Sequence, residues 1–231
     1  MLSVLLKRLF KINIGMQFKR NIQYYFGKIG LRFGFASFIF FERLLSDIDC
    51  SFFVNNISIK RINVDDLERS HVIGFLSFEE ANEKILLPGC YFFVAFKGEC
   101  VLGSCWLMTG SVNLNFMDHE DELCAGIGYI AHVIVNSKAR RQGVAAALIN
   151  YAISVGENIG LRKLIVCCDA RNSAIRRIMF KISFKQYLVV DYSRLLFLNL
   201  YWCKWFYGDK MMRKDLQIGS LTFSPLRGFC R

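Results

Sequence analysis

The feature that most constrains this chain is the run Val135–Ala146, where an apolar segment leads into a basic turn and a glycine. The residues before it, 129–135, form a continuous apolar run typical of a buried strand. Gly143 is followed by small apolar residues, which predicts a helix beginning at Val144. A helix that starts directly after a strand and a turn presents unpaired backbone N–H groups. The sequence therefore predicts an anion site at the start of this helix.

The residues of the turn suit a diphosphate. Arg140 and Arg141 can donate charge-assisted hydrogen bonds. Gly143 and Ala145 keep side chains small, so a pyrophosphate can approach the backbone. The pattern is neither a Walker loop, which needs Gly-Lys-Ser/Thr, nor the Gly-x-Gly-x-x-Gly dinucleotide fingerprint. We therefore expect a pyrophosphate-bearing ligand that is held by a loop of neither of these two kinds.

Strand and helix signals are interspersed along the rest of the chain. Apolar or alternating runs predict strands at 57–62, 129–135 and 164–168 and hairpins at 90–107 and 187–202. Helices are expected after Asn63, from the Ser77–Glu80 capping box, over 144–155 and over 174–182, with an acidic loop at 110–126. Gly103, inside the first hairpin, indicates a bulge or a close backbone approach. This order predicts a mixed α/β domain.

Composition narrows the class of protein. The chain has 231 residues, of which 54% are hydrophobic and 21% charged, and this balance excludes intrinsic disorder. A domain of this size can bury a core without a disulfide or metal staple. A membrane-spanning helix needs about 20 apolar residues, and the best run, 33–41, is bracketed by Arg32 and Glu42. We therefore expect no membrane span, and no signal peptide, because Lys7 interrupts the first apolar run.

The cysteines and the charge point to a compartment and to partners. The nine cysteines include no Cys-x-x-Cys pair, so we expect no metal site and interpret them as reduced thiols of a cytoplasmic protein. The net charge is +11, and residues 1–45 carry eight Lys or Arg against Glu42. This arm is either amphipathic and suited to an anionic membrane face, or a helical extension packed on the domain. No nucleic-acid-binding motif accompanies the charge, so nucleic acid is not expected.

The turn and its surroundings resemble the GNAT superfamily of acyl-CoA-dependent N-acetyltransferases. Arg140-x-x-Gly143-x-Ala145 is similar to the superfamily's pyrophosphate loop, and Val135 ends the preceding strand as it does there. The segment from Asn172 to Phe184 looks like the Asn-led helix of the superfamily. The resemblance covers about residues 57–202. It implies an α/β fold whose mixed, mostly antiparallel sheet contains splayed central parallel strands and is flanked by helices.

The resemblance also implies a cofactor and its binding residues. Acetyl-CoA or another acyl-CoA would lie between the splayed strands Tyr129–Val135 and Leu164–Cys168. The residues expected to hold it are Ile134 and Val135 at the pantetheine arm, Arg140, Arg141, Gln142, Gly143, Val144 and Ala145 at the pyrophosphate, and Asn172. Arg171, Arg176 and Arg177 could face the 3′-phosphate, and they equally suit a solvated helix face.

The catalytic groups depart from the superfamily pattern. Tyr129 stands where the superfamily often has Glu or His as general base, and Met179 replaces its general-acid tyrosine. Strand alternation turns His132 to the face opposite Tyr129, so we interpret it as a core histidine rather than a base. The remaining candidates for catalysis are Tyr129, Glu122 and His119, the last two in an acidic loop.

These expectations combine into a function and a domain plan. The first hypothesis is an N-acyltransferase acting on a primary amine of a small molecule. An amino sugar is the preferred acceptor. The reason is that the placement of a basic N-terminal extension before the domain resembles superfamily members that accompany bacterial surface-polysaccharide synthesis. The alternative is a non-catalytic acyl-CoA-sensing or membrane-surface module. We expect a basic extension at 1–50, the acyltransferase domain at 51–202 and an aromatic-basic tail at 203–231, in the cytoplasm or at the inner membrane face.

Overall fold

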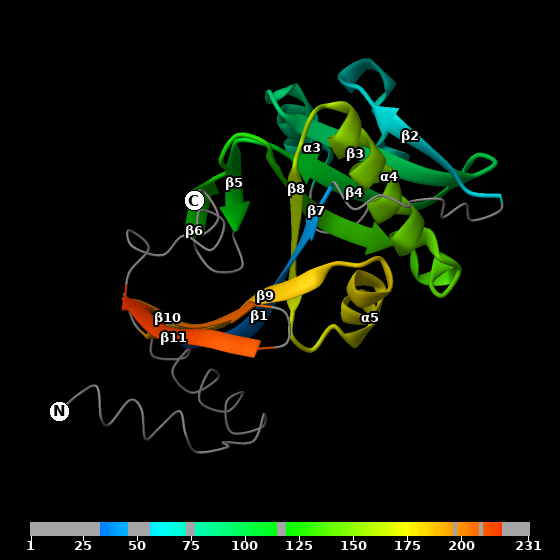
Figure 1. Cartoon of the computed structure of the whole chain (residues 1–231). Helices are drawn as coiled ribbons and strands as arrows, with labels where there is room; N and C mark the ends of the chain where they lie inside the picture. The colour runs from blue at the N-terminus through cyan, green and yellow to red at the C-terminus, as the bar shows by residue number, and fades with distance from the viewer. Residues whose placement is uncertain are drawn as a thin grey trace.

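The computed structural model describes residues 33–45, 56–72, 77–114, 119–195, 198–207 and 210–218. Their main feature is a nine-stranded sheet in the order β11-β10-β9-β1-β8-β7-β4-β3-β2 (Figure 1). The strands are β1 (Phe33–Leu44), β2 (Ser58–Ile62), β3 (Cys90–Lys97), β4 (Cys100–Met108), β7 (Ile127–Val135), β8 (Lys163–Asp169), β9 (Lys185–Leu195), β10 (Leu198–Tyr207) and β11 (Lys210–Ile218). Among these described strands, β7 and β8 form the one parallel pair. The expected mixed, mostly antiparallel sheet with a central parallel pair is confirmed.

Helices cover the two faces of the sheet separately. The helix α3 (Phe78–Leu86) contributes to one buried cluster, which also contains Trp106 and Tyr129. The helices α4 (Val144–Asn158) and α5 (Ser173–Lys181) contribute to a second cluster around Leu148 and Met179. Short 3-10 turns lie at Val64–Asp66, Arg69–His71 and Ser137–Ala139. The sheet therefore has an α3 face and an α4/α5 face.

The strand β1 corrects the expected domain boundaries. It lies between β8 and β9 and is antiparallel to both, with Phe40 and Phe41 fully buried on opposite faces. The expected extension at 1–50 therefore includes a central strand of the domain. The apolar run 33–41 is too short to span a bilayer, but it has the length and composition of a strand buried on both faces. At the other end the sheet continues through β11, beyond the expected limit at residue 202.

The structure describes only residues 33–45 of the arm that was expected to lie on a membrane. Residues 33–45 belong to the sheet and its end, and 1–32 lie outside the described residues. None of the described helices combines the length and hydropathy that crossing a bilayer requires.

The local structure confirms one helix start and differs from the expectations for a second helix and for the cysteines. The Ser77 capping box is confirmed, since its hydroxyl accepts from the Glu80 N–H and the Glu80 carboxylate accepts from the Ser77 N–H. The helix expected after Asn63 is wrong, because Val64–Asp66 is a three-residue turn without a side-chain cap. The expectation that all cysteines are reduced is also wrong, because Cys124 is disulfide-bonded.

The acidic loop expected at 110–126 contains a second sheet. The strands β5 (Ser111–Leu114) and β6 (His119–Glu122) pair antiparallel. Val112 and Leu114 alternate with polar residues and are fully buried in the cluster of the α3 face. This alternation, rather than the acidic composition, decides the local structure, since it gives the hairpin one apolar face to pack on the main sheet.

Candidate active site

The parallel strands β7 and β8 part in the middle of the sheet. They pair from Ile127 with Lys163 to Ile130 with Val166, and not beyond, although β7 continues to Val135 and β8 to Asp169. The side chains of residues 133–135 and 167–169 are half-buried, whereas those of the paired residues 127–130 and 164–166 are buried. The divergence exposes strand edges in the centre of a sheet, where a ligand can take the place of a strand.

A bulge interrupts β7 at this divergence. Ser104 pairs with Ile134 and Trp106 with Ala131, so the two residues His132 and Val133 stand opposite the single residue Cys105. His132 has a left-handed φ of 48°. A bulge of this kind leaves one residue unpaired in the ladder and changes which face the side chains take.

Past the bulge, β7 turns backbone groups toward the divergence. The Asn136 N–H donates to the Leu102 carbonyl on β4 at 2.8 Å. Because backbone groups alternate sides along a strand, the N–H and C=O of Val135 point away from β4, toward β8. The parallel ladder with β8 has already ended there, so these groups can pair with an extended ligand.

The turn after β7 brings the chain to the start of α4. Gly143 has φ 81° and ψ 0°, a left-handed conformation that favours glycine. No side chain caps the first N–H groups of α4, and its first turn contains no acidic residue. Arg140, Arg141 and Gln142 are exposed, with the Gln142 amide donating to the Lys138 carbonyl at 3.1 Å. This is a helix N-terminus with free donors, adjacent cations and no competing carboxylate, as a diphosphate requires.

Gly103 sets the position of α4 against the sheet. A Cβ at Gly103 would lie 2.6 Å from the Ile134 carbonyl oxygen, 3.2 Å from Val144 and 3.3 Å from Leu148. The first turn of α4 therefore packs directly on β4 beside the end of β7. The expected close backbone approach is confirmed.

The loop after β8 holds Asn172 and the arginines. The Asn172 side-chain oxygen accepts from the Ile175 N–H at 3.2 Å and caps α5, so one side of this amide is already used by the fold. Arg171 forms an ion pair with Asp169 at 2.6 Å, and Arg176 donates to the Ala170 carbonyl at 3.2 Å. Both arginines thus have partners within the loop.

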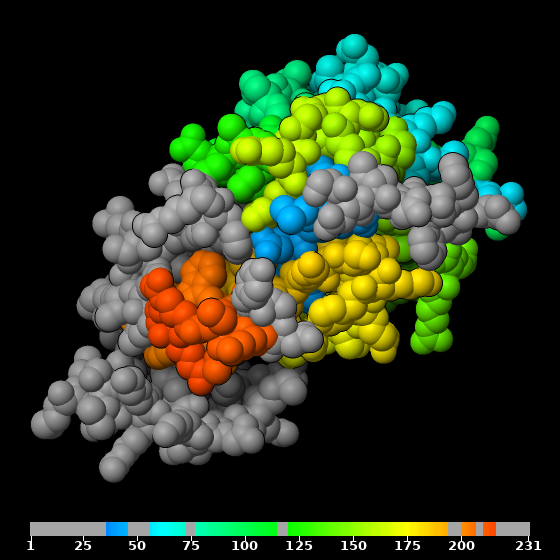
Figure 2. Space-filling view, in the orientation of Figure 1, coloured from blue at the N-terminus to red at the C-terminus, as the bar shows by residue number. Residues whose placement is uncertain are grey.

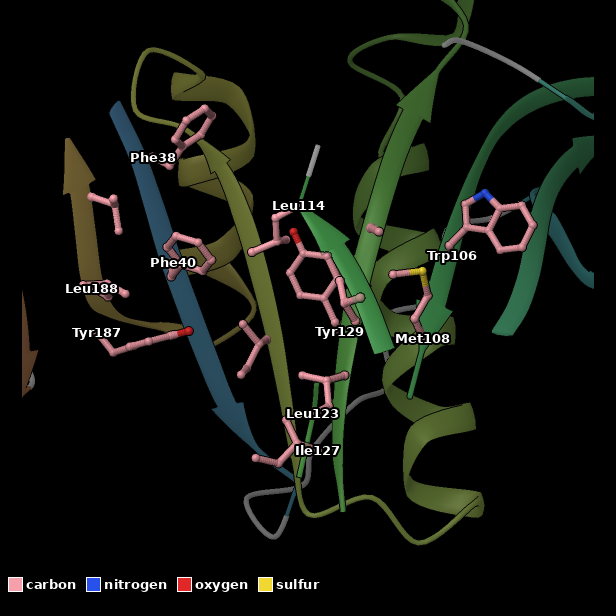
Figure 3. Packing of buried hydrophobic residues seen from close by; sticks show 14 of the residues in the cluster. Phe38, Phe40, Trp106, Met108, Leu114, Leu123, Ile127, Tyr129, Tyr187 and Leu188 are labelled. Carbon is pink, nitrogen blue, oxygen red and sulfur yellow. The ribbon is translucent and has the colours of Figure 1, made fainter. Parts of the chain in front are cut away.

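Tyr129 is placed on the α3 face, one residue before the strands stop pairing. It is 4% exposed, and Figure 3 shows its ring beside Leu114 and Leu123 of the β5–β6 region. Burial, with a smaller contribution from Cys167 and Cys168, raises the pKa of its phenol well above the ordinary value. Tyr129 therefore stays protonated near neutral pH and can donate a proton but cannot accept one.

The other two expected catalytic residues lie on β6. Glu122 is exposed there, and its backbone N–H donates to the buried Asp121 carboxylate at 3.0 Å. His119 begins the same strand, and its side chain lies outside the described residues. The hairpin β5–β6 packs on the cluster that contains Tyr129, so Glu122 and Tyr129 belong to the same side of the sheet.

His132 differs from its interpretation as a core histidine. Its side chain is exposed, because the bulge and the left-handed φ break the alternation on which that interpretation depends. Ala131 belongs to the cluster of the α3 face and Val133 packs against that of the α4/α5 face, so His132 lies where the strand changes face. Lys84 of α3 acts on it electrostatically. No pattern in the sequence predicts a bulge at this position. Hydrophobic periodicity therefore could not identify His132 and Lys84 as candidate functional residues.

Tyr187 is a further buried phenol that the sequence does not single out. A bulge between Phe40 and Phe41 on β1 leaves Tyr187 of β9 outside the ladder, and its ring lies 6.1 Å from that of Phe40. Burial raises the pKa of Tyr187, with Cys167, Glu42, Tyr129 and Asp121 adding to the effect. The α3 face thus holds two protonated phenols close to the divergence.

Comparisons with known proteins agree with this geometry. The model of the acetyltransferase (GNAT) family matches residues 56–180, more than half of the chain. A GCN5-related N-acetyltransferase from Sphaerobacter thermophilus is 15% identical with a TM-score of 0.51, covering 76% of this chain and 56% of that one.

Two further solved structures are similar. The glucosamine N-acetyltransferase region of a fungal multi-domain β-N-acetylglucosaminidase is 16% identical with a TM-score of 0.51, covering 75% of this chain and 22% of that one. An aminoglycoside acetyltransferase from an uncultured soil metagenomic sample, in complex with sisomicin, is 16% identical with a TM-score of 0.42, covering 56% and 88%. The chain thus spans about half of the Sphaerobacter protein and about a fifth of the fungal one. At these identities the first two likenesses show the fold.

Proposed function

Because the chain belongs to the acetyltransferase (GNAT) family, whose members are acyl-CoA-dependent transferases, we propose that it acetylates the primary amine of an amino sugar. The observation that carries the proposal is the combination of the diverging β7–β8 pair with the uncapped N-terminus of α4. One element offers strand-edge groups to an extended ligand, and the other offers N–H groups to its phosphates.

The residues present fit a bound acyl-CoA. Val135 would pair with the pantetheine arm, whereas the backbone groups of Ile134, also expected there, point toward Ser104 of β4. The segment from Arg140 to Ala145 would hold the diphosphate. Asn172 would use the amide hydrogens that its cap of α5 leaves available. When bound, acyl-CoA supplies a thioester carbon that an amine can attack. The chain's own task is to hold that ester, to take up the acceptor's proton and to protonate the departing sulfur.

Tyr129 suits the last of these tasks. Its phenol is buried on the α3 face beside Cys167, where the strands part, and its raised pKa means that it still carries its proton when the thiolate leaves. It would pass that proton to the sulfur as it takes up the one lost by the amine nitrogen. Glu122, exposed on β6 of the same side, is the second candidate and would bind the cationic acceptor amine. In this proposal Tyr129 is the general acid, although it stands where the superfamily often has a general base.

The acceptor class has narrower support. One of the similar structures is named as a glucosamine N-acetyltransferase region. The resemblance of the N-terminal arrangement to acetyltransferases of surface-polysaccharide synthesis points to the same class of amine.

Replacing Gly143 by valine tests the anion site. A β-branched residue at φ 81° would shift the backbone and block the approach of phosphates, so we expect Gly143→Val to abolish coenzyme A binding measured by calorimetry. The matched control is Gly160→Val, because Gly160 has φ 80° at the other end of α4. Each variant should lose about 1–2 kcal/mol of stability, and only Gly143→Val should lose affinity. Equal affinity of both variants would contradict the site.

Thiol release from acetyl-CoA separates catalysis from sensing. The full chain is assayed in turn with glucosamine, with sisomicin and with a peptide that has a single free amine. Turnover with the sugar amines and not with the peptide supports the proposal. Coenzyme A binding without turnover on any amine would instead favour the non-catalytic acyl-CoA-sensing module.

A further inference from the structure

We propose that His132 is the base that takes the proton from the acceptor amine. The inference rests on the proposed function and deepens it by naming a residue for the one task that Tyr129 cannot perform. It follows from where the bulge of β7 puts the imidazole.

The bulge places His132 beside the divergence of β7 and β8, where the proposed function puts the acyl group and the acceptor. It is the first residue after β7 stops pairing in register with β4, and two residues after β7 stops pairing with β8. A left-handed φ of 48° is unusual for histidine and persists only where the surrounding structure determines it. The strain turns the side chain out of the strand alternation and leaves it exposed.

Lys84 gives the imidazole its electrostatic environment. The Lys84 ammonium lies 5.1 Å from the centre of the Trp106 ring, and Trp106 pairs with Ala131, the residue before His132. Partial burial and the charge of Lys84 lower the pKa of His132. The imidazole is therefore neutral, and able to accept a proton, at and somewhat below neutral pH.

Four titratable groups of β7 and the neighbouring strands are uncharged, and Glu122 is exposed on β6 of the same side of the sheet. Burial raises the pKa of Cys90 on β3, of Tyr129 on β7 and of Cys167 and Cys168 on β8, so all four stay protonated. Asp169 at the end of β8 is paired with Arg171. Among these described groups, Lys84 is the cation that adds to burial in lowering the pKa of His132.

The proton balance gives His132 one defined step. The acceptor arrives as an ammonium ion and passes one proton to the neutral imidazole, directly or through one water. The amine nitrogen then bonds to the acyl carbon as the carbon–sulfur bond breaks. The nitrogen's second proton leaves for the thiolate through the Tyr129 phenol, which gives its own proton and is reprotonated. The products are the amide, the thiol of coenzyme A and an imidazolium that releases its proton to solvent.

Imidazole titration by NMR tests the environment without any substrate. The chain has three histidines, so the His132 signal is assigned by its loss in His132→Asn. Asparagine tolerates a left-handed φ, so this variant removes the base and keeps the backbone. We expect a pKa below about 6.5 in the wild type and a rise in Lys84→Met. The matched control is Lys60→Met, since Lys60 lies 5.8 Å from the Phe96 ring on the far edge strands. A His132 pKa at or above the ordinary value, or one unmoved by Lys84→Met, would overturn the inference.

Transfer to glucosamine tests the step itself. In His132→Asn we expect unchanged coenzyme A affinity, a kcat/KM lower by roughly 10²–10⁴-fold, and loss of the acidic limb of the pH profile. In Lys84→Met that limb should move to higher pH together with the NMR pKa. A His132→Asn enzyme that keeps wild-type turnover and pH profile contradicts the role of His132 alone. A wild type that binds coenzyme A but acetylates no amine contradicts the proposed function and the role of His132 with it.

Discussion

At the scale of single residues, burial decides what the titratable groups of this site can do. Tyr129 stands where the superfamily often has a general base, and Tyr187 is a second phenol close to it. Enclosure on the α3 face raises the pKa of both, so they remain donors. His132 is exposed and neutral instead, because a bulge takes it out of the alternation of β7. Chemical role here depends on environment more than on residue type.

The raised pKa of Tyr129 predicts a dependence of stability on alkaline pH. Above about pH 10 the unfolded chain releases the phenol proton while the folded chain keeps it. The stabilisation from the neutral buried phenol is therefore complete below that pH and is lost as the pH rises, by about 1.4 kcal/mol per pH unit. We expect Tyr129→Phe to reduce the slope of unfolding free energy against pH by about one such group, measured by urea denaturation between pH 10 and pH 11.

Tyr187→Phe provides the comparison for this measurement. Its phenol is equally enclosed, so it should reduce the slope by a similar amount. Slopes identical to that of the wild type in both variants would mean that neither phenol stays protonated in the folded protein.

At the scale of elements, the site depends on how closely α4 approaches the sheet. The absence of a side chain at Gly103 lets the Ile134 carbonyl, Val144 and Leu148 meet over β4. This contact puts the first turn of α4 beside the end of β7, so the N–H groups proposed to bind the diphosphate lie next to the strand-edge groups proposed to bind the pantetheine arm.

Adding one methyl group at Gly103 should disturb this contact. The Cβ of Gly103→Ala would lie 2.6 Å from a backbone oxygen that cannot rotate away. We expect a loss of about 1–3 kcal/mol of unfolding free energy and weaker coenzyme A binding, measured by urea denaturation and calorimetry. Gly98→Asn is the control in the turn of the same hairpin, because open space surrounds Gly98 and asparagine tolerates its φ of 60°. Equal effects of the two changes would show that Gly103 does not determine the position of α4.

At the scale of the whole molecule, an N-terminal segment completes the centre of the sheet. In Figure 2 the blue atoms of β1 lie between the lime-green and yellow segments of the α4–α5 part of the chain. Phe41 packs edge to face on Phe180 of α5 with ring centres 5.4 Å apart, and the Arg43 guanidinium donates to the Ile182 carbonyl at 2.8 Å. The strand thus joins the part of the sheet that contains the diverging β7–β8 pair to the strands β9, β10 and β11.

Truncating Phe41 tests this placement of β1. The side chain is fully buried, so we expect Phe41→Ala to lose about 3–5 kcal/mol of unfolding free energy in urea denaturation. Leu44→Ala on the same strand is the matched control, because Leu44 is 49% exposed and should lose much less. Similar small losses for both would contradict a central β1.

Local patterns in the sequence determined most of the elements and the ligand class. The Ser77 capping box, the 90–107 hairpin and the strand–turn–helix run ending at Ala146 all depend on contacts between residues close in the chain, so their signals are visible in one dimension. The family resemblance of Arg140-x-x-Gly143-x-Ala145 carried the coenzyme with it, and residues 56–180 match the family.

Only the tertiary structure decided the place of β1, the strand nature of β5 and β6, and the exposure of His132. Each depends on pairing between residues far apart in sequence. The composition of a strand does not show which other strands it pairs with. A bulge shifts every side chain after it to the other face, so alternation misplaces a residue such as His132. The chemistry available to the site is set by these long-range contacts, because they fix which titratable groups are buried and which are exposed.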